Sequence, residues 1–106
     1  MKWKIANFDQ LEDKWSKSDS SKLIYCLFKS NYENECNIDW DFIKEKFINI
    51  SSFNNLMKNW RIIKSTVPDF QTKTYKQIIH FLYDNFMAKY IKTSDDLRLL
   101  EEFYNN

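Results

Sequence analysis

The sequence predicts an all-α fold, and three observations support this prediction. The 106 residues include no glycine and one proline, which disfavours glycine-dependent hairpins and glycine-rich phosphate loops. Apolar residues recur at spacings of three and four in several stretches, as they do along one face of an α-helix. The length suits one domain with a single modest core, which an aromatic content of 18% can fill densely. We therefore expect helices joined by short polar turns.

The first helix is expected to run from Trp15 to Ser30, after an N-terminal arm at residues 1–13 whose apolar residues follow no clear period. Ser16, followed three residues later by Asp19, resembles a capping box at its start. Its helical stripe consists of Leu23, Ile24, Leu27 and Phe28.

A second helix follows a polar, aperiodic loop at residues 31–37. Asp39 is expected to cap this helix, which should end near Asn49. Its buried face is predicted to hold Trp40, Ile43 and Phe47. Only Ile50 and Ser51 then remain before the next periodic stretch, and such a short turn between amphipathic helices is typical of a helix-turn-helix.

The third helix, at about residues 52–64, carries the functional hypothesis. One stripe is apolar and is expected to face inward: Phe53, Leu56, Met57, Trp60 and Ile63. The opposite side is amide and basic, with Asn54, Asn55, Lys58, Arg61 and Ile62. No acid occurs between Glu45 and Asp69. Asparagine and cationic side chains hydrogen-bond base edges and neutralise phosphates, so we expect this helix to enter a DNA major groove.

A fourth, long helix is expected after Val67-Pro68, since the residue before proline is driven out of the helical region. Thr74 and Gln77 form a second capping-box pattern. The stripe that follows is Tyr75, Ile78, Ile79, Leu82, Phe86 and Met87. Ser94 is expected to cap a short acidic last helix. Its apolar face would be Leu97, Leu100 and Phe103.

These stripes define the predicted core of a single domain, with a three-helix unit at residues 14–66 and a packed helical extension at residues 67–106. The predicted core residues are Trp15, Leu23, Leu27, Trp40, Ile43, Phe47, Phe53, Leu56, Met57, Trp60, Ile63, Ile79, Leu82 and Phe86.

Charge is unevenly distributed along the chain, although the net charge is only +1. Residues 51–92 carry seven Lys/Arg against two Asp, a net of +5, whereas residues 93–106 carry one Arg against four acids, a net of −3. A basic middle section is consistent with a polyanionic partner, although a solvated helix face is the alternative.

The remaining reactive residues predict no catalytic or metal site. Cys26 is expected in the core and Cys36 in a loop, both as free thiols in a reducing compartment. His80 is the only histidine and is expected on the surface. No nucleophile, base and orienting group can be assembled from these residues. We therefore expect no enzyme activity, no cofactor, no metal, no small-molecule substrate and no membrane partner.

Three tryptophans carry a resemblance to a known family. Trp15, Trp40 and Trp60 fall one per helix, and W-S-K-S-D-S-S-K-L together with I-D-W-D-F-I resembles a Myb/SANT repeat. The stretch N-W-R-I-I-K-S-T-V-P-D-F-Q-T-K-T-Y-K-Q-I-I-H-F-L-Y is similar to the C-terminal Myb region of RNA polymerase I transcription termination factors. The resemblance implies a homeobox-like helix-turn-helix whose third helix reads DNA, with Lys58 and Arg61 near its base-contacting positions.

The size and the Lys/Asn/Ile/Phe bias also resemble the small homeobox-like accessory subunits of the ciliate DNA N6-adenine methyltransferase complex. That resemblance implies a nuclear, non-catalytic subunit that brings affinity for double-stranded DNA to a larger protein assembly. The candidate DNA-binding residues are Asn54, Asn55, Lys58, Asn59, Arg61, Ile62, Lys64, Lys73 and Lys76.

Alternatives remain open at this point. For Asn54 and Asn55 the alternative is ordinary solvated helix surface in an asparagine-rich chain. Lys64 lies nearer the apolar stripe and either snorkels or contacts phosphate. The alternative function is a SANT-like protein-interaction module in a chromatin complex.

Overall fold

Every element that the structure describes is helical. The computed structural model describes residue 15, residues 17–47 and residues 53–105, and no strand occurs in these ranges. The helices are α2 (Lys17–Ser30), α3 (Trp40–Lys46), α4 (Phe53–Ser65), α5 (Tyr75–Leu82), α6 (Ala88–Tyr90) and α7 (Ser94–Asn105). Two 3₁₀ turns, η1 (Glu35–Asn37) and η2 (Phe70–Thr72), and a π turn, η3 (Tyr83–Met87), complete the described elements. The predicted all-α fold is confirmed.

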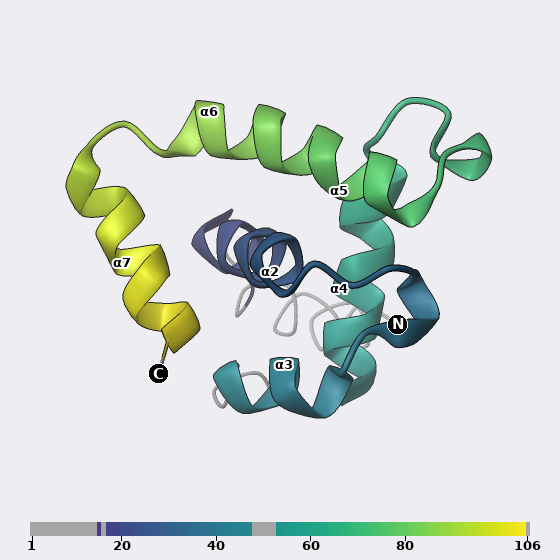
Figure 1. The fold of residues 1–106 in the computed structure, drawn as a ribbon, viewed down its shortest axis with the longest axis horizontal. Coiled ribbons are helices and arrows are strands. Elements are labelled where there is room, and N and C mark those ends of the chain that lie inside the picture. The colour runs from purple at the N-terminus through teal and green to yellow at the C-terminus, as the bar shows by residue number, and fades with distance from the viewer. Residues whose placement is uncertain (1–14, 16, 48–52, 106) are drawn as a thin grey trace, which may run out of the picture.

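The helices surround α2, which Figure 1 shows almost end-on at the centre of the molecule. In that view α3 lies below it, α4 to its right, the α5–α6 segment above it and α7 to its left. The last helix and the predicted DNA-reading helix therefore lie on opposite sides of α2. The N-terminal arm, the Ser16 cap and the Ile50-Ser51 turn fall outside the described residues.

Burial on all sides distinguishes α2 from the other helices. Five consecutive residues from Leu23 to Leu27 are at most 2% exposed, and Ser20 and Ser21 before them are also buried. Because successive helical residues point in different directions, five buried neighbours require packing around the whole helix. The sequence had predicted a stripe and a buried Cys26 here, so the structure extends the core to Tyr25.

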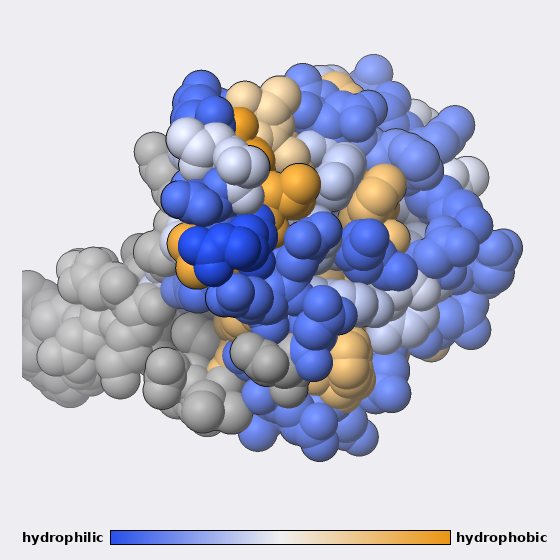
Figure 2. Space-filling view, turned by 60° about the vertical axis from the view of Figure 1, so that its left-hand side comes forward, coloured by the Kyte–Doolittle hydropathy of each residue, from blue (hydrophilic) through white to orange (hydrophobic). Residues whose placement is uncertain are grey.

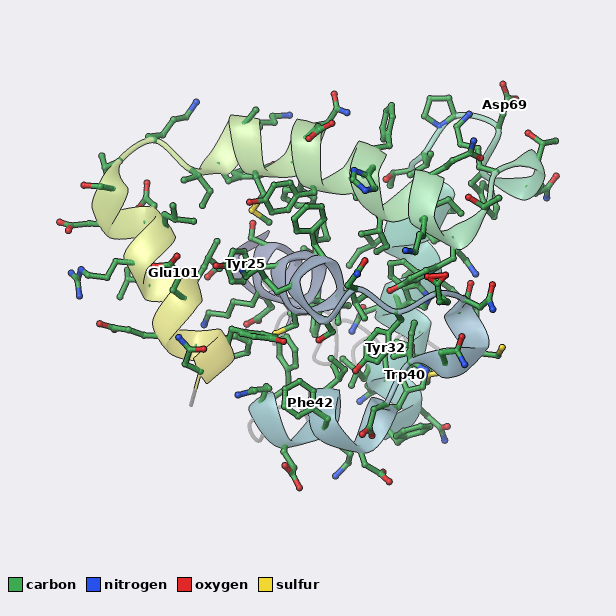
Figure 3. The ribbon with its side chains drawn as sticks, in the orientation of Figure 1. Tyr25, Tyr32, Trp40, Phe42, Asp69 and Glu101 are labelled. Atoms are coloured by element: carbon green, nitrogen blue, oxygen red, sulfur yellow. The ribbon has the colours of Figure 1, made fainter. Side chains whose placement is uncertain are left out.

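Aromatic rings connect α2 to the helices beside it. Tyr25, which Figure 3 labels on the side of α2 toward α7, has its ring 6.2 Å from that of Tyr104. Tyr104 in turn lies 6.1 Å from the ring of Phe42 on α3. Lys46 donates a hydrogen bond to the Tyr104 carbonyl oxygen, which satisfies an acceptor in the last turn of α7. Burial, and then the Glu101 carboxylate, raise the pKa of Tyr25.

Two of the predicted helix caps are confirmed. The Asp39 carboxylate accepts a hydrogen bond from the Phe42 backbone N–H at 3.1 Å. Thr74 and Gln77 exchange hydrogen bonds in a capping box, at 3.2 and 2.9 Å. Residues 31–37 form the predicted connection, apart from the single turn η1.

Two described residues other than glycine adopt the left-handed conformation, Asn31 after α2 and Asp69 before η2. Asn31, at φ 54°, follows α2 and donates its N–H to the carbonyls of Leu27 and Phe28. Asparagine tolerates this conformation better than most residues, so it takes the place that glycine usually holds. After α4, Asp69 has φ 56° in the turn that begins at Val67-Pro68. Val67 is 1% exposed, so this turn is anchored in the core.

The cap of the last helix is corrected by one residue. Ser94 was the predicted cap, but the Thr93 hydroxyl accepts from the Asp96 N–H at 3.2 Å while Asp96 Oδ2 accepts from the Thr93 N–H at 3.1 Å. Reciprocal capping needs a side-chain acceptor three residues after the cap, and Ser94 has Leu97 there. The position of α7 also leaves Leu97 39% exposed, whereas Leu100 is 5% exposed.

Nine of the fourteen predicted core residues are buried: Leu23, Leu27, Ile43, Phe47, Leu56, Trp60, Ile63, Ile79 and Leu82. Trp15, Trp40, Met57 and Phe86 are only partly buried. Trp15 stacks on Phe47 at 5.4 Å and donates its indole N–H to Ser20 at 2.8 Å. Phe53 is the clearest correction, at 37% exposed: it is the first residue of α4, and its ring lies edge-to-face with that of Trp40, with 6.4 Å between the ring centroids.

The π turn explains the position of Phe86. A π turn takes more residues than an α turn, so the step of five from Leu82 to Met87 returns to the buried side. Both of those residues are buried, while Phe86 moves to the flank and its ring packs on that of Tyr90, with 4.6 Å between the ring centroids.

Helix α3 ends earlier than predicted. Phe47 leaves the helical region at φ −112° and ψ 55°, so the helix ends at Lys46 rather than near Asn49.

The cysteines take the predicted places. Cys26 is buried and Cys36 is exposed, and both are free thiols. Burial raises the pKa of Cys26 to about 12, so its unreactive thiol form dominates at neutral pH. Across the described ranges, no helix combines the length and the apolar character needed to span a membrane.

Asp96 should make the acid stability of the protein measurably pH-dependent. Hydrogen bonds from the Lys92 and Thr93 backbone N–H groups hold the pKa of this carboxyl below its ordinary value of 3.8. A lowered folded-state pKa means that the carboxylate stabilises the fold above that ordinary value, and that this contribution is lost as pH falls through the folded value. The Asp96→Asn variant should therefore lose less stability than the parent protein as the pH falls from about 5 to about 2. The urea midpoints of the two proteins across this pH range measure the difference. Parallel acid profiles of the two proteins would contradict this assignment.

Candidate nucleic-acid interface

The inward side of α4 fixes its orientation. Leu56, Trp60 and Ile63 are 1%, 0% and 6% exposed, at the helical spacing that places them on one side. The Tyr75 ring, in the first turn of α5, packs edge-to-face with the Trp60 ring, with 6.3 Å between the ring centroids. Burial is the main cause that raises the pKa of Tyr75. These contacts confirm the predicted apolar stripe in the half of α4 that contains Trp60.

The outward side of α4 displays the predicted amide and basic residues. Asn54 and Arg61 are exposed, and Ile62 is 49% exposed. Asn55 and Lys58 are half-buried, and each already has an interaction partner in the structure. Asn59 is also half-buried. No acidic residue belongs to α4, so this face combines hydrogen-bonding side chains with positive charge.

Two predicted phosphate-binding lysines are engaged within the molecule. Lys64 Nζ lies 3.0 Å from both carboxylate oxygens of Glu35, and its side chain is only 18% exposed. Lys76 Nζ lies 2.9 Å from Glu33 Oε1, in a more exposed pair. Lys73 is half-buried at the end of η2, near the start of α5. The expected basic surface is therefore partly neutralised by the loop at residues 31–37.

Glu35 connects that loop to α4. Its Oε2 accepts the indole N–H of Trp60 at 3.2 Å, in addition to the bonds from Lys64 one helical turn later. The Lys64 ammonium also lies 5.8 Å from the centroid of the Trp60 ring. The Glu35 carboxylate accepts hydrogen bonds from a buried indole N–H and a half-buried ammonium, and these bonds hold the loop at residues 31–37 against α4. The sequence showed Glu33 and Glu35 only as part of a polar loop, and nothing in local spacing indicates which lysines they meet.

Comparison with known proteins identifies no similar sequence or structure. The chain matches no protein-family model, no curated protein and no solved structure. The residues of α4 and the charged groups beside it are therefore the basis for assigning a function.

The remaining candidate groups are His80 and the side chains that could bind a metal ion. His80 is exposed, as predicted, and its ring meets the edge of Phe28 at 5.4 Å. No group of three or more His, Cys, Asp or Glu residues in the described ranges is arranged to hold a metal ion.

Replacing Trp60 should test the orientation of α4. Trp60→Ala should lower the free energy of unfolding by about 3–5 kcal/mol, since it empties a fully buried aromatic site and leaves Glu35 without its indole donor. Ile62→Ala, on the exposed side of the same helix, should change stability by no more than about 0.5 kcal/mol. Urea denaturation of the two variants measures both values. A larger loss of unfolding free energy for Ile62→Ala than for Trp60→Ala would show that the side of α4 with Ile62, and not the side with Trp60, faces the core.

Proposed function

We propose that this protein binds double-stranded DNA by placing α4 in the major groove. The observation that carries the proposal is the division of α4 into a buried apolar side and an outward side of asparagine and arginine, with no acid along the helix. The major groove admits an α-helix, and its base edges present patterns that these side chains recognise.

Each outward residue has a role that its chemistry supports. Asn54 and Asn55 are suited to pair with the N6 and N7 positions of adenine, and Arg61 with O6 and N7 of guanine. Ile62, which is 49% exposed, is suited to contact a thymine methyl group. Lys58, Asn59 and Lys73 are placed in the proposal as phosphate contacts around this centre.

The proposed arrangement is a Myb/homeobox-like helix-turn-helix, in which α3 precedes the reading helix α4. Trp60 is the fully buried tryptophan of the family-like set, and Trp15 and Trp40 flank the core. A single small module buries limited DNA surface, so we propose that the protein is a non-catalytic subunit of a larger nuclear complex, such as a DNA methyltransferase or a transcription assembly.

A protein-interaction module of the SANT type is the second candidate. The specific observation in its favour is that the outward side of α4 also exposes a large apolar side chain, Ile62, at 49%. An exposed isoleucine is suited to a protein surface as well as to a thymine methyl group. DNA binding and its salt dependence separate the two candidates.

Charge reversal on α4 should abolish duplex binding. Lys58→Glu/Arg61→Glu places two carboxylates where the proposal places phosphate and guanine, so affinity for a random duplex should fall by at least about 100-fold in fluorescence anisotropy. For about five phosphate contacts in the parent, log affinity should fall with log salt at a slope of about −4.5.

The matched control is Lys89→Glu/Lys92→Glu, which makes the same change in net charge at two exposed lysines around the end of α6. It should retain most of the affinity, because those residues lie away from α4 (Figure 1). Equal losses in the two double variants would indicate non-specific attraction. Unchanged binding by Lys58→Glu/Arg61→Glu would favour the protein-interaction module.

Neutralising the acidic loop should strengthen DNA binding. Glu33→Gln/Glu35→Gln removes the two carboxylates that pair with Lys76 and Lys64, while glutamine keeps a carbonyl oxygen for the Trp60 indole. Two released ammonium groups should raise affinity by about tenfold and steepen the salt slope by about one to two units. Asp84→Asn/Glu101→Gln makes the same charge change at exposed positions on η3 and α7. If this control gains as much affinity, the effect belongs to net charge and not to the released lysines.

A further inference from the structure

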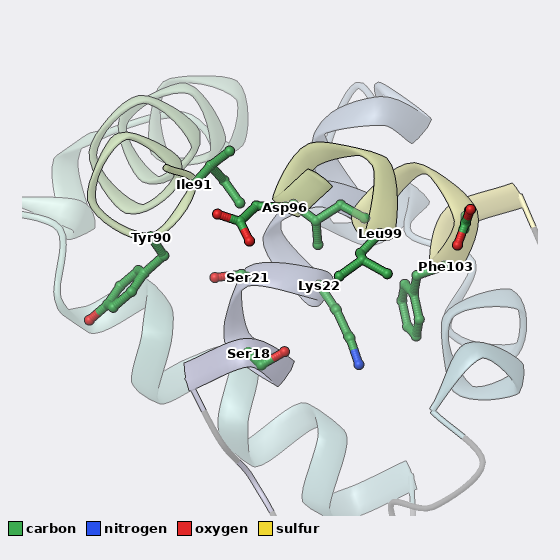
Figure 4. A pocket seen from close by; sticks show the side chains of 10 residues that line it. Ser18, Ser21, Lys22, Tyr90, Ile91, Asp96, Leu99 and Phe103 are labelled. Carbon is green, nitrogen blue, oxygen red and sulfur yellow. The ribbon is translucent and has the colours of Figure 1, made fainter. Parts of the chain in front are cut away.

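A pocket of about 550 Å³ lies on the side of α2 opposite α4, between α2, the end of α6 and α7 (Figure 4). Residues from three separate elements meet there, including Ser21 of α2, Ile91 after α6, and Asp96 and Leu99 of α7. Figure 4 places Ser21 and Asp96 toward Ile91, and Leu99 and Phe103 at the other end. The pocket therefore has the polar groups of Ser21 and Asp96 at one end, and the side chains of Leu99 and Phe103, with the Lys22 ammonium over the Phe103 ring, at the other.

Ser21 provides an unsatisfied hydrogen-bonding group in this pocket. The residue is 4% exposed, and its hydroxyl makes no hydrogen bond in the structure. A buried hydroxyl without a partner costs free energy that a bound group can recover, and it can both donate and accept. The adjacent helical residue Ser20, by contrast, accepts the indole N–H of Trp15. The polar end of the pocket is thus complementary to an occupant with its own hydrogen-bonding group.

Two carboxylates and one ammonium line the pocket, and α7, the helix that supplies the carboxylates, carries four acids against one arginine. Oδ2 of Asp96 is held by two backbone N–H groups, and Glu102, which also lines the pocket, is paired with Arg98 at 3.0 Å. The Lys22 ammonium lies 5.1 Å from the centroid of the Phe103 ring, over its face. A cationic group on an occupant would therefore meet fixed carboxylates at the polar end and rim.

The end of the pocket at Leu99 and Phe103 is open to solvent. Leu99 is 57% exposed although it lines the pocket. Figure 2, which turns this side of the molecule forward, shows apolar surface among hydrophilic residues. A leucine exposed next to a pocket gains from being covered by an apolar side chain.

We infer that this pocket binds a short segment of a partner protein that carries leucine-like side chains next to lysine or arginine. The apolar side chains of the segment cover Leu99 and Phe103, and its basic group meets Asp96 and Glu102. One backbone amide of the segment hydrogen-bonds the Ser21 hydroxyl. A peptide supplies these three kinds of contact together, and the acidic character of α7 selects a basic sequence over an acidic one. This site lies apart from α4 and does not depend on DNA binding.

The test is an NMR titration of the ¹⁵N-labelled 106-residue protein with acetyl-Lys-Leu-Leu-Lys-amide and, separately, acetyl-Glu-Leu-Leu-Glu-amide. The basic peptide should bind with a Kd of about 1 mM or below and shift the amide signals of residues 18–22, 91 and 96–103. The acidic peptide should bind at least about tenfold more weakly. Equal binding of the two peptides, or shifts centred on α4, would overturn the inference.

Matched variants locate the contacts. Leu99→Asn should weaken binding of the basic peptide at least about fivefold, whereas Leu97→Asn, an exposed leucine of the same helix outside the pocket, should have little effect. Ser21→Ala should also weaken binding, by about fivefold, without loss of stability, because it removes an unsatisfied hydroxyl. If leucinamide binds as tightly as the basic peptide, the pocket is a small-molecule site and the peptide assignment is wrong. Equal effects of Leu97→Asn and Leu99→Asn would also contradict it.

Discussion

The burial of α2 on all sides is the constraint on which the rest of the structure depends. A helix with five consecutive buried residues, Leu23 to Leu27, needs neighbours around its whole circumference, and α3, α4, the α5–α6 segment and α7 provide them. Each surrounding helix therefore turns one apolar side inward and leaves its other side to solvent. Both proposed binding sites draw on these outer sides, and α2 contributes to one of them through residues near its start.

The outer sides of α4 and α7 have opposite chemical character. The first displays amide and basic groups, and the second displays carboxylates with exposed leucines. Because α2 separates them, as Figure 1 shows, the DNA proposed for α4 and the basic segment proposed for the pocket beside α7 would not compete for the same place. The loop between α2 and α3 adds a further element, since Glu33 and Glu35 hold two cations that would otherwise extend the basic surface.

Much of the helix pattern was predictable from local signals. The caps at Asp39 and Thr74, the inward side of α4 at Leu56 and Trp60, and the burial of Cys26 follow from residue type and spacing alone. Two of the differences between prediction and structure have signals in the sequence. Thr93 has an acid three residues later, and the unbroken apolar run Leu23 to Leu27 indicates burial around a whole helix. The π turn that moves Phe86 aside has no comparable signal.

The sequence by itself determined where helices form, how they begin and which side of α4 is apolar, because these properties depend on residues within one or two turns of each other. Tertiary structure alone decided that Glu35 meets Trp60 and Lys64, that Glu33 meets Lys76, and that Ser21 faces a pocket without a hydrogen-bond partner. Those contacts join residues that are distant in the chain or on different elements. Their formation depends on how the helices pack around α2, which no local spacing specifies.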